Sequence, residues 1–122
     1  AGFPAASEVD AAAVAAVAAT MRRARIGALA RCQEGDIVTA ARALESATQA
    51  RIHLFLATSP IHREHKLHMS KAQVLNTAVA AVRRACALCG DVEFSAEDAL
   101  RTEPEFLIEV FNAVDRRRRA RP

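Results

Sequence analysis

The sequence predicts an α/β fold in which three parallel strands alternate with helices, and three observations support this prediction. Residues 52–57 form a nearly continuous apolar run, which is typical of a strand covered on both faces. Residues 74–89 carry apolar side chains at helical spacing. The expected order is helix, strand, helix, strand, helix, strand, helix. Regular alternation of this kind implies parallel strands joined by crossover helices.

The first expected helix follows Ser7, which can cap it, and Asp10 stands three residues later in the capping-box position. Alanine-rich sequence extends this helix to about Arg23. The next segment, 25–31, is short and mostly apolar between charged ends, which suits a buried strand, although a run of this length is ambiguous. Asp36 is expected to cap the second helix.

The central strand, 52–57, is followed by an expected polar loop over residues 58–69. Ser70 can cap a third helix, and Gln73 completes a capping box with it. Gly90 is a natural stop for this helix because glycine readily adopts the conformation that ends one.

Residues 91–95 are predicted to form the third strand. A fourth helix is expected to open at Thr102, with Pro104 in its first turn and an apolar face made of Phe106, Leu107, Val110, Phe111 and Val114. An eight-unit barrel of βα repeats takes about 250 residues, so the chain corresponds to roughly half of one. We expect one domain over residues 1–114 and a disordered basic tail over residues 115–122.

The composition excludes several classes of protein. Hydrophobic residues make up 52% of the 122 residues and charged residues 25%, so disorder throughout the chain is not expected. Fifteen of the seventeen basic residues are arginine, and five of these lie in the last seven positions. The remainder of the chain is therefore near neutral, which argues against a nucleic-acid partner.

The sequence also bears on the cellular compartment. No apolar run approaches the roughly 20 residues of a membrane span, and the alanine-rich run 11–19 lacks the basic leader of a signal peptide. The three cysteines cannot all pair, and without a secretory signal they favour a reducing compartment. We expect a cytoplasmic protein with no membrane partner.

Polar side chains stand on two of the expected strands. His53 shares a face with Phe55 by the period of two, and Glu93, Ser95 and Glu97 share a face where the third strand runs into its loop. Barrels and open α/β sheets place active sites at the carboxyl ends of parallel strands. A histidine can polarise a carbonyl or move a proton, and a glutamate can act as a base. The alternatives are a hydrogen-bonded core histidine and solvated glutamates.

Several separated motifs resemble the 2-isopropylmalate synthase family. They are Arg-Ile-His-Leu-Phe-Leu-Ala-Thr-Ser-Pro-Ile-His at 51–62, Lys-Leu-His-Met-Ser at 66–70 and Asp-Val-Glu-Phe-Ser-Ala-Glu-Asp-Ala at 91–99. The segments 2–7 and 28–31 fit the same family in order and spacing, so the match covers about residues 1–114. Homocitrate and citramalate synthases share the barrel and some motifs, but Ala-Thr-Ser-Pro-Ile-His and Val-Glu-Phe-Ser-Ala-Glu-Asp favour the isopropylmalate branch.

The resemblance implies a partial TIM-type (β/α)8 barrel of about three βα units with a leading helix. It implies an acyltransferase of leucine and branched-chain amino acid biosynthesis that condenses acetyl-CoA with 2-oxoisovalerate in a Claisen reaction. A divalent metal, Mg²⁺ or Mn²⁺, polarises the keto acid in the full-length family. A base removes a methyl proton from the acetyl group, the enolate attacks the ketone, and the thioester is hydrolysed.

The resemblance also assigns roles by position. His53 and Glu97 would be catalytic, with His53 contacting the keto acid near its carbonyl. Ser95 and Glu97 would line the same substrate pocket. Phe55 would shape the apolar part that holds the branched side chain, and Thr58 would lie at the rim of the strand end.

Two motifs of the family do not occur in this sequence. The family's Arg-Asp pair supplies a keto-acid contact and a metal ligand, and its His-x-His motif supplies two further metal ligands; neither is present here. We therefore expect no metal ligands in this chain and no activity from it in isolation. Exposed sheet edges would favour a homo-oligomer or another association. The alternative is a non-catalytic fragment, or a piece of a homocitrate or citramalate synthase.

Three further patterns have competing interpretations. His62, His65 and His68 recur every three residues and could bind a metal, although the family places this stretch in a loop without an obligatory metal role. Cys86 and Cys89 have redox or zinc spacing but lie on an apolar helical face, which favours small buried hydrophobes. The terminal arginine run could hold phosphate groups or remain a solvated tail.

Overall fold

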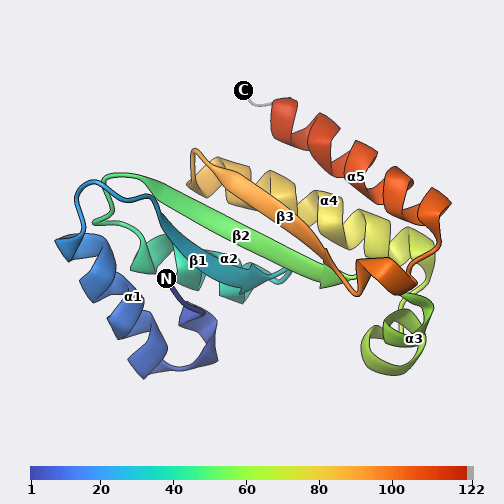
Figure 1. Ribbon diagram of the computed structural model, residues 1–122, viewed down its shortest axis with the longest axis horizontal. Helices are drawn as coiled ribbons and strands as arrows, with labels where there is room; N and C mark the ends of the chain where they lie inside the picture. The colour runs from blue at the N-terminus through green and yellow to red at the C-terminus, as the bar shows by residue number, and fades with distance from the viewer. Residues whose placement is uncertain (121–122) are drawn as a thin grey trace.

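The computed structural model describes residues 1–120 and contains a three-stranded parallel sheet (Figure 1). The strands are β1 (Ile26–Arg31), β2 (Ala50–Ala57) and β3 (Val92–Glu97), in the spatial order β1-β2-β3. The expected α/β fold with three parallel strands is confirmed. The open sheet with its crossover helices is consistent with part of a TIM-type barrel.

Helices precede, separate and follow the strands. Figure 1 shows α2 and α4 covering one face of the sheet, with α5 lying beside α4, and α1 near the β1 edge. The helical segments are η1 (Pro4–Ala6), α1 (Glu8–Thr20), α2 (Glu34–Ala43), α3 (Pro60–His62), η2 (Arg63–Leu67), α4 (Lys71–Leu88), η3 (Ala99–Arg101) and α5 (Pro104–Arg119). Within residues 1–120, no helix has the length and apolarity needed to cross a membrane.

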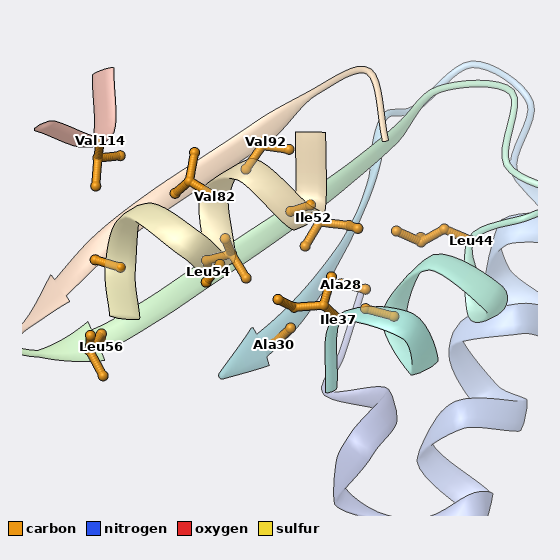
Figure 2. Packing of buried hydrophobic residues seen from close by; sticks show 14 of the residues in the cluster. Ala28, Ala30, Ile37, Leu44, Ile52, Leu54, Leu56, Val82, Val92 and Val114 are labelled. Carbon is orange, nitrogen blue, oxygen red and sulfur yellow. The ribbon is translucent and has the colours of Figure 1, made fainter. Parts of the chain in front are cut away.

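The hydrophobic core lies between the sheet and this helical layer. Alternate residues of the strands point into it and are buried, whereas their neighbours on the other face are mostly half-buried. Figure 2 shows the strand residues of the core, Ala28, Ala30, Ile52, Leu54, Leu56 and Val92, with Ile37 and Val82 from the helices. The central strand was expected to be covered on both faces, but helices cover only one, so the opposite face of the sheet stays accessible.

The first residues extend the sheet at the outer edge of β1. Gly2 forms a parallel bridge with Ala28, and its carbonyl accepts a 2.8 Å hydrogen bond from the Leu29 amide. A Cβ on Gly2 would lie 3.1 Å from Val14 Cγ2, so glycine permits the close approach of α1. The predicted cap of α1 is confirmed by the Ser7 Oγ, which accepts from the Asp10 amide at 3.1 Å.

Among the other helix ends predicted from local sequence patterns, the start of α4 agrees with the structure and the end of α1 differs from it. The capping box of Ser70 and Gln73 at α4 is confirmed. The first helix ends at Thr20 rather than at about Arg23, since the backbone of Met21 is already extended, and the Arg22 side chain donates back to the Ala18 carbonyl at 3.1 Å. The loop expected at 58–69 contains α3 and the single wide turn η2.

Two expected helix caps are wrong. Asp36 lies inside the first turn of α2, where its carboxylate binds the Arg31 side chain at 2.7 Å; Gln33 is the residue that precedes the helix. Thr102 is buried and bonds Thr58, and α5 begins two residues later. In each case another contact, local for Asp36 and between distant segments for Thr102, binds the side chain that the spacing assigned to a cap.

The C-terminal segment is helical further than the expected domain boundary. α5 continues through Arg119, so residue 114 lies within a helix rather than at its end. Residues 121–122 of the expected tail lie outside the described residues. The division into a barrel part and a tail stays a prediction.

Candidate active site

His53 and Ser95 meet on the open face of the sheet. In the β2–β3 register, His53 lies opposite Glu93 and Phe55 lies opposite Ser95, which makes His53 and Ser95 diagonal neighbours on one face. The His53 Nε2 and the Ser95 Oγ are 2.6 Å apart, and both side chains are half-buried. The adjacent parallel strands therefore bring together two of the predicted site residues.

Glu97 lies further toward the carboxyl end of the same face. It stands opposite Ala57 and two residues beyond Ser95, a distance of roughly 7 Å along a strand. Lys66 Nζ contacts its two carboxylate oxygens at 3.2 and 3.3 Å, and His62 Nε2 lies 3.9 Å from one of them. A molecule that contacts both the His53–Ser95 pair and Glu97 must extend along the strand direction.

An aromatic wall stands beside the histidine. The ring of Phe55 makes an edge-on contact with Phe3, with ring centroids 6.2 Å apart. The guanidinium of Arg31 lies 5.9 Å from the Phe3 ring and is held by Asp36. The hydrogen bond and charge of Asp36 raise the pKa of Arg31 above its usual value. This arrangement places a cation and two apolar rings at the carboxyl end of β1.

Thr58 lies beneath this edge rather than on its open face. Its side chain is fully buried, and its hydroxyl lies 2.7 Å from that of Thr102. Its amide donates to the Glu97 carbonyl at 3.2 Å, which continues the β2–β3 pairing by one residue. The structure therefore does not bring the Thr58 hydroxyl to His53 and Ser95.

A serine, a histidine and an aspartate also meet below the strand ends. Ser59 Oγ lies 2.9 Å and Asp98 Oδ2 3.2 Å from the same atom, His62 Nδ1. A nucleophilic triad needs the hydroxyl at the other ring nitrogen, and Ser59 is fully buried. Hydrogen bonds from Ser59 and then Arg101 hold the pKa of Asp98 below its usual range. This cluster anchors α3 to the end of β3.

A groove of about 590 Å³ runs over the amino half of the open face. Its lining includes Phe3, Leu29, His53 and Glu93, but neither Ser95 nor Glu97. The predicted shared pocket is therefore only partly formed by the described residues: His53 belongs to the groove, and Glu97 lies outside it.

The described residues do not fit a metal site on their own. Across residues 1–120, no three side chains of histidine, cysteine, aspartate or glutamate are grouped so that they could hold an ion. The nearest carboxylates are already engaged, Glu93 by Arg51 and Glu97 by Lys66. The three loop histidines separate as well, since His65 is exposed beside Glu64 while His62 faces Asp98.

The cysteines lie in core-facing positions. Cys86 and Cys89 pack against the hydrophobic core, and Cys89 Sγ lies 3.3 Å from the Asp91 carbonyl. Burial raises the pKa of the Cys32 thiol to about 12. This surrounding favours the interpretation of the Cys-x-x-Cys pattern as small buried hydrophobes.

Two charged residues at the edge were not among the expected site residues. Lys66 belongs to the irregular segment between β2 and α4, where no periodicity indicates which way a side chain points. Arg31 could have been found, because it ends the first strand on the same face as Leu29.

The fold and the edge define a class of protein. Parallel strands backed by crossover helices, with polar residues at their carboxyl ends, are the arrangement of a (β/α) barrel wall. The sequence profile of the HMGL-like family matches residues 1–117. The chain belongs to the HMGL-like family.

Individual relatives carry a more specific name. The chain is 57% identical over 109 residues to the 2-isopropylmalate synthase of Xylella fastidiosa (strain M23), a match that covers 89% of the chain and 21% of the relative. It is 57% identical over 113 residues to that of Rhodopirellula baltica, covering 93% and 21%, and 53% identical over 109 residues to that of Xanthomonas axonopodis pv. citri, covering 89% and 21%. The chain thus spans about a fifth of these relatives.

Proposed function

We propose that the chain supplies one wall of the active site of a 2-isopropylmalate synthase-like acyltransferase. The reaction is the condensation of acetyl-CoA with 2-oxoisovalerate in leucine biosynthesis. The observation that carries the proposal is the 2.6 Å contact of His53 with Ser95 on the open face of adjacent parallel strands. Relatives named 2-isopropylmalate synthase, matching 89–93% of the chain, support the choice of reaction.

His53 contacts the keto acid in this proposal. Its ring donates a hydrogen bond to the ketone oxygen or moves a proton there, as a positioned imidazole does in general acid–base catalysis. Ser95 holds the Nε2 side of the ring, so the hydroxyl fixes the ring orientation. Phe55 and Phe3 provide apolar surface for the branched side chain of the keto acid.

Glu97 acts on the acetyl group. Its carboxylate lies further along the strands than the His53–Ser95 pair, which suits a second reactant that lies beside the keto acid. To accept a methyl proton it must turn from Lys66, and the substrate carboxylate can take its place on that ammonium group. The resulting enolate attacks the ketone, and the thioester is then hydrolysed.

The HMGL-like family implies a divalent metal, which would polarise the ketone. The described residues supply no ligand set for it. We propose that the isolated chain is incomplete and inactive, and that the metal ligands and remaining strands belong to other segments.

A chimera tests this proposal. The matched segment of the Xylella fastidiosa relative is replaced by the 109 residues of this chain that align with it, and CoA release is measured with acetyl-CoA, 2-oxoisovalerate and Mg²⁺ or Mn²⁺. We expect the chimera to turn over and the isolated chain not to. A folded chimera without turnover would contradict the proposal, and so would 2-oxoglutarate or pyruvate as the preferred substrate.

A second candidate is a non-catalytic fragment that associates through its uncovered surfaces. The exposed apolar side chains Leu100 (102% exposed), Val9 (79%) and Ile108 (62%) favour it. Sedimentation of the purified chain over a range of concentrations tests it, because association predicts a mass above 13.1 kDa that rises with concentration.

A further inference from the structure

A groove on the outer helical layer is lined by arginines from two helices. It lies between α4 and α5, which run side by side in Figure 1, and its volume is about 370 Å³. α5 contributes Arg117. α4 contributes residues that recur at spacings of three and four along one side of the helix, namely Asn76, Val79, Ala80, Arg83, Arg84 and Ala87.

Positive charge in this groove is poorly neutralised. Arg84 Nε pairs with Glu34 at 2.7 Å. Arg83 and Arg117 have no ion-pair partner within residues 1–120, and both are exposed. Three arginines therefore line one groove, and two of them lack an ion-pair partner among the described residues.

The nearest carboxylate on α5 is already committed. Asp115 contacts Arg119 at 2.7 Å and Arg118 at 3.6 Å, on the same helix. The cations at the end of α5 gain from the helix dipole, but that gain does not require Arg117 to share a groove with Arg83. Like charges brought together at this site repel unless an anion lies between them.

The shape of the groove indicates what kind of anion fits. Planar guanidinium groups bind phosphate oxygens through paired hydrogen bonds, and the Asn76 amide is a further donor. The alanines Ala80 and Ala87 leave space between the polar groups, and Val79 provides an apolar floor. A small molecule with a phosphate at one end and an apolar or planar part at the other would match both surfaces.

We propose that this groove binds a small organic phosphate. Arg83 and Arg117 contact its phosphate oxygens from opposite banks, and the remainder of the ligand lies over Val79 and Ala80. The site is separate from the carboxyl ends of the strands, because its arginines lie in the later turns of α4 and α5, and both helices run back toward the amino ends of the strands. It does not depend on the proposed acyl transfer.

The test titrates ADP and inorganic pyrophosphate into the 122-residue chain and follows the α4 amides by ¹H–¹⁵N spectra. We expect saturable shifts at 79–84, with the Arg83→Ala and Arg117→Ala variants each weakening binding by roughly tenfold. Arg42→Ala is the matched control, because it removes an exposed arginine without an ion pair among the described residues, on α2. It should change affinity by less than about twofold.

Three results would overturn the proposal. One is a chain that gives no saturable shifts with either phosphate. Another is an Arg42→Ala variant that weakens binding as much as Arg83→Ala, since that pattern reports general charge attraction. The third is an oligonucleotide that shifts the same amides and binds more tightly than either small phosphate. Circular dichroism of each variant verifies that the helices remain formed.

Discussion

The two ends of the sheet hold their charges differently. At the amino end, Arg51 bridges Asp91 at 3.0 Å and Glu93 at 3.1 Å, and a second arginine also reaches Asp91. Further along the open face, near the middle of β2 and β3, His53 and Ser95 meet through a hydrogen bond instead of an ion pair. Acids at the amino end are thus fixed by cations within the sheet and its flanking turns.

The cation at the carboxyl end, Lys66, does not lie on a strand or in a turn that flanks the amino end. Glu97 is held by Lys66, which lies on the short irregular segment before α4 and is 53% exposed. A ligand can replace this contact without disturbing the strands. In barrels of parallel strands the carboxyl ends carry the active site and the amino ends serve stability, and we propose the same division for this sheet.

The largest expected effect separates the hydrogen-bonded His53 from the ion-paired Glu93 by their contribution to catalysis. In the chimera, His53→Ala should lower kcat at least about a hundredfold, because it removes the group that acts on the ketone. Glu93→Gln, opposite His53 in the register but bound to Arg51, should stay within about threefold. Turnover at the same rate in His53→Ala would contradict the assignment of the site.

The next effect concerns stability at the carboxyl end. Arg63 is 11% exposed and donates to both oxygens of Glu103 and to the Thr58 carbonyl, while its guanidinium lies over Phe106. Arg63→Ala should lower the free energy of unfolding by about 2–3 kcal/mol, because the Thr58 carbonyl loses this donor and Glu103 keeps only its contact with Lys71. Urea denaturation measures the change. Arg51→Ala, more exposed and at the other end, should cost less; the reverse order would contradict the comparison.

Acid should weaken the carboxyl end through Asp98 and Glu103. Their folded pKa values are lowered, Asp98 mainly by Ser59 and Glu103 mainly by Arg63. As the pH falls, the unfolded chain therefore binds protons at these two carboxyl groups before the folded chain does. The stability that the two carboxylates contribute is complete above about pH 5 and is lost as the pH falls below about 4. Urea midpoints between pH 7 and pH 2 should show a shallower loss for Glu103→Gln than for the unmodified chain. Glu45→Gln controls for total charge, and equal slopes in all three would contradict the prediction.

The smallest effect is expected at Lys66. Because its contact with Glu97 is exposed, Lys66→Met should change the free energy of unfolding by less than about 0.5 kcal/mol. If the keto-acid carboxylate takes the place of Glu97 on this ammonium group, KM for 2-oxoisovalerate in the chimera should rise roughly threefold. Lys66→Arg should restore the lower KM. An unchanged KM in Lys66→Met would remove Lys66 from the binding step.

Local sequence patterns predicted much of the fold because strands and helix caps depend on neighbours along the chain. The period of two placed His53 and Phe55 on one face, and the spacing of Ser70 and Gln73 marked the start of α4. The resemblance to a family added the choice of which polar residues to examine.

Contacts between distant segments could not be predicted in this way. Thr58 was assigned to the rim, but its hydroxyl pairs with Thr102, which is 44 residues away. Lys66 reaches Glu97 across 31 residues, from a segment without a regular period. These pairings depend on how α5 and the irregular segment pack against the strand ends, which no local spacing encodes.

The most direct test of the account is the environment of the His53 ring, read from long-range ¹H–¹⁵N spectra of the chain at neutral pH. We expect the Nε2 resonance to show a hydrogen-bonded nitrogen and to move in Ser95→Ala, while the exposed His65 stays unchanged. A His53 Nε2 resonance that is identical with and without the Ser95 hydroxyl would show that the two side chains do not meet. The proposed active-site wall would then lose its central contact.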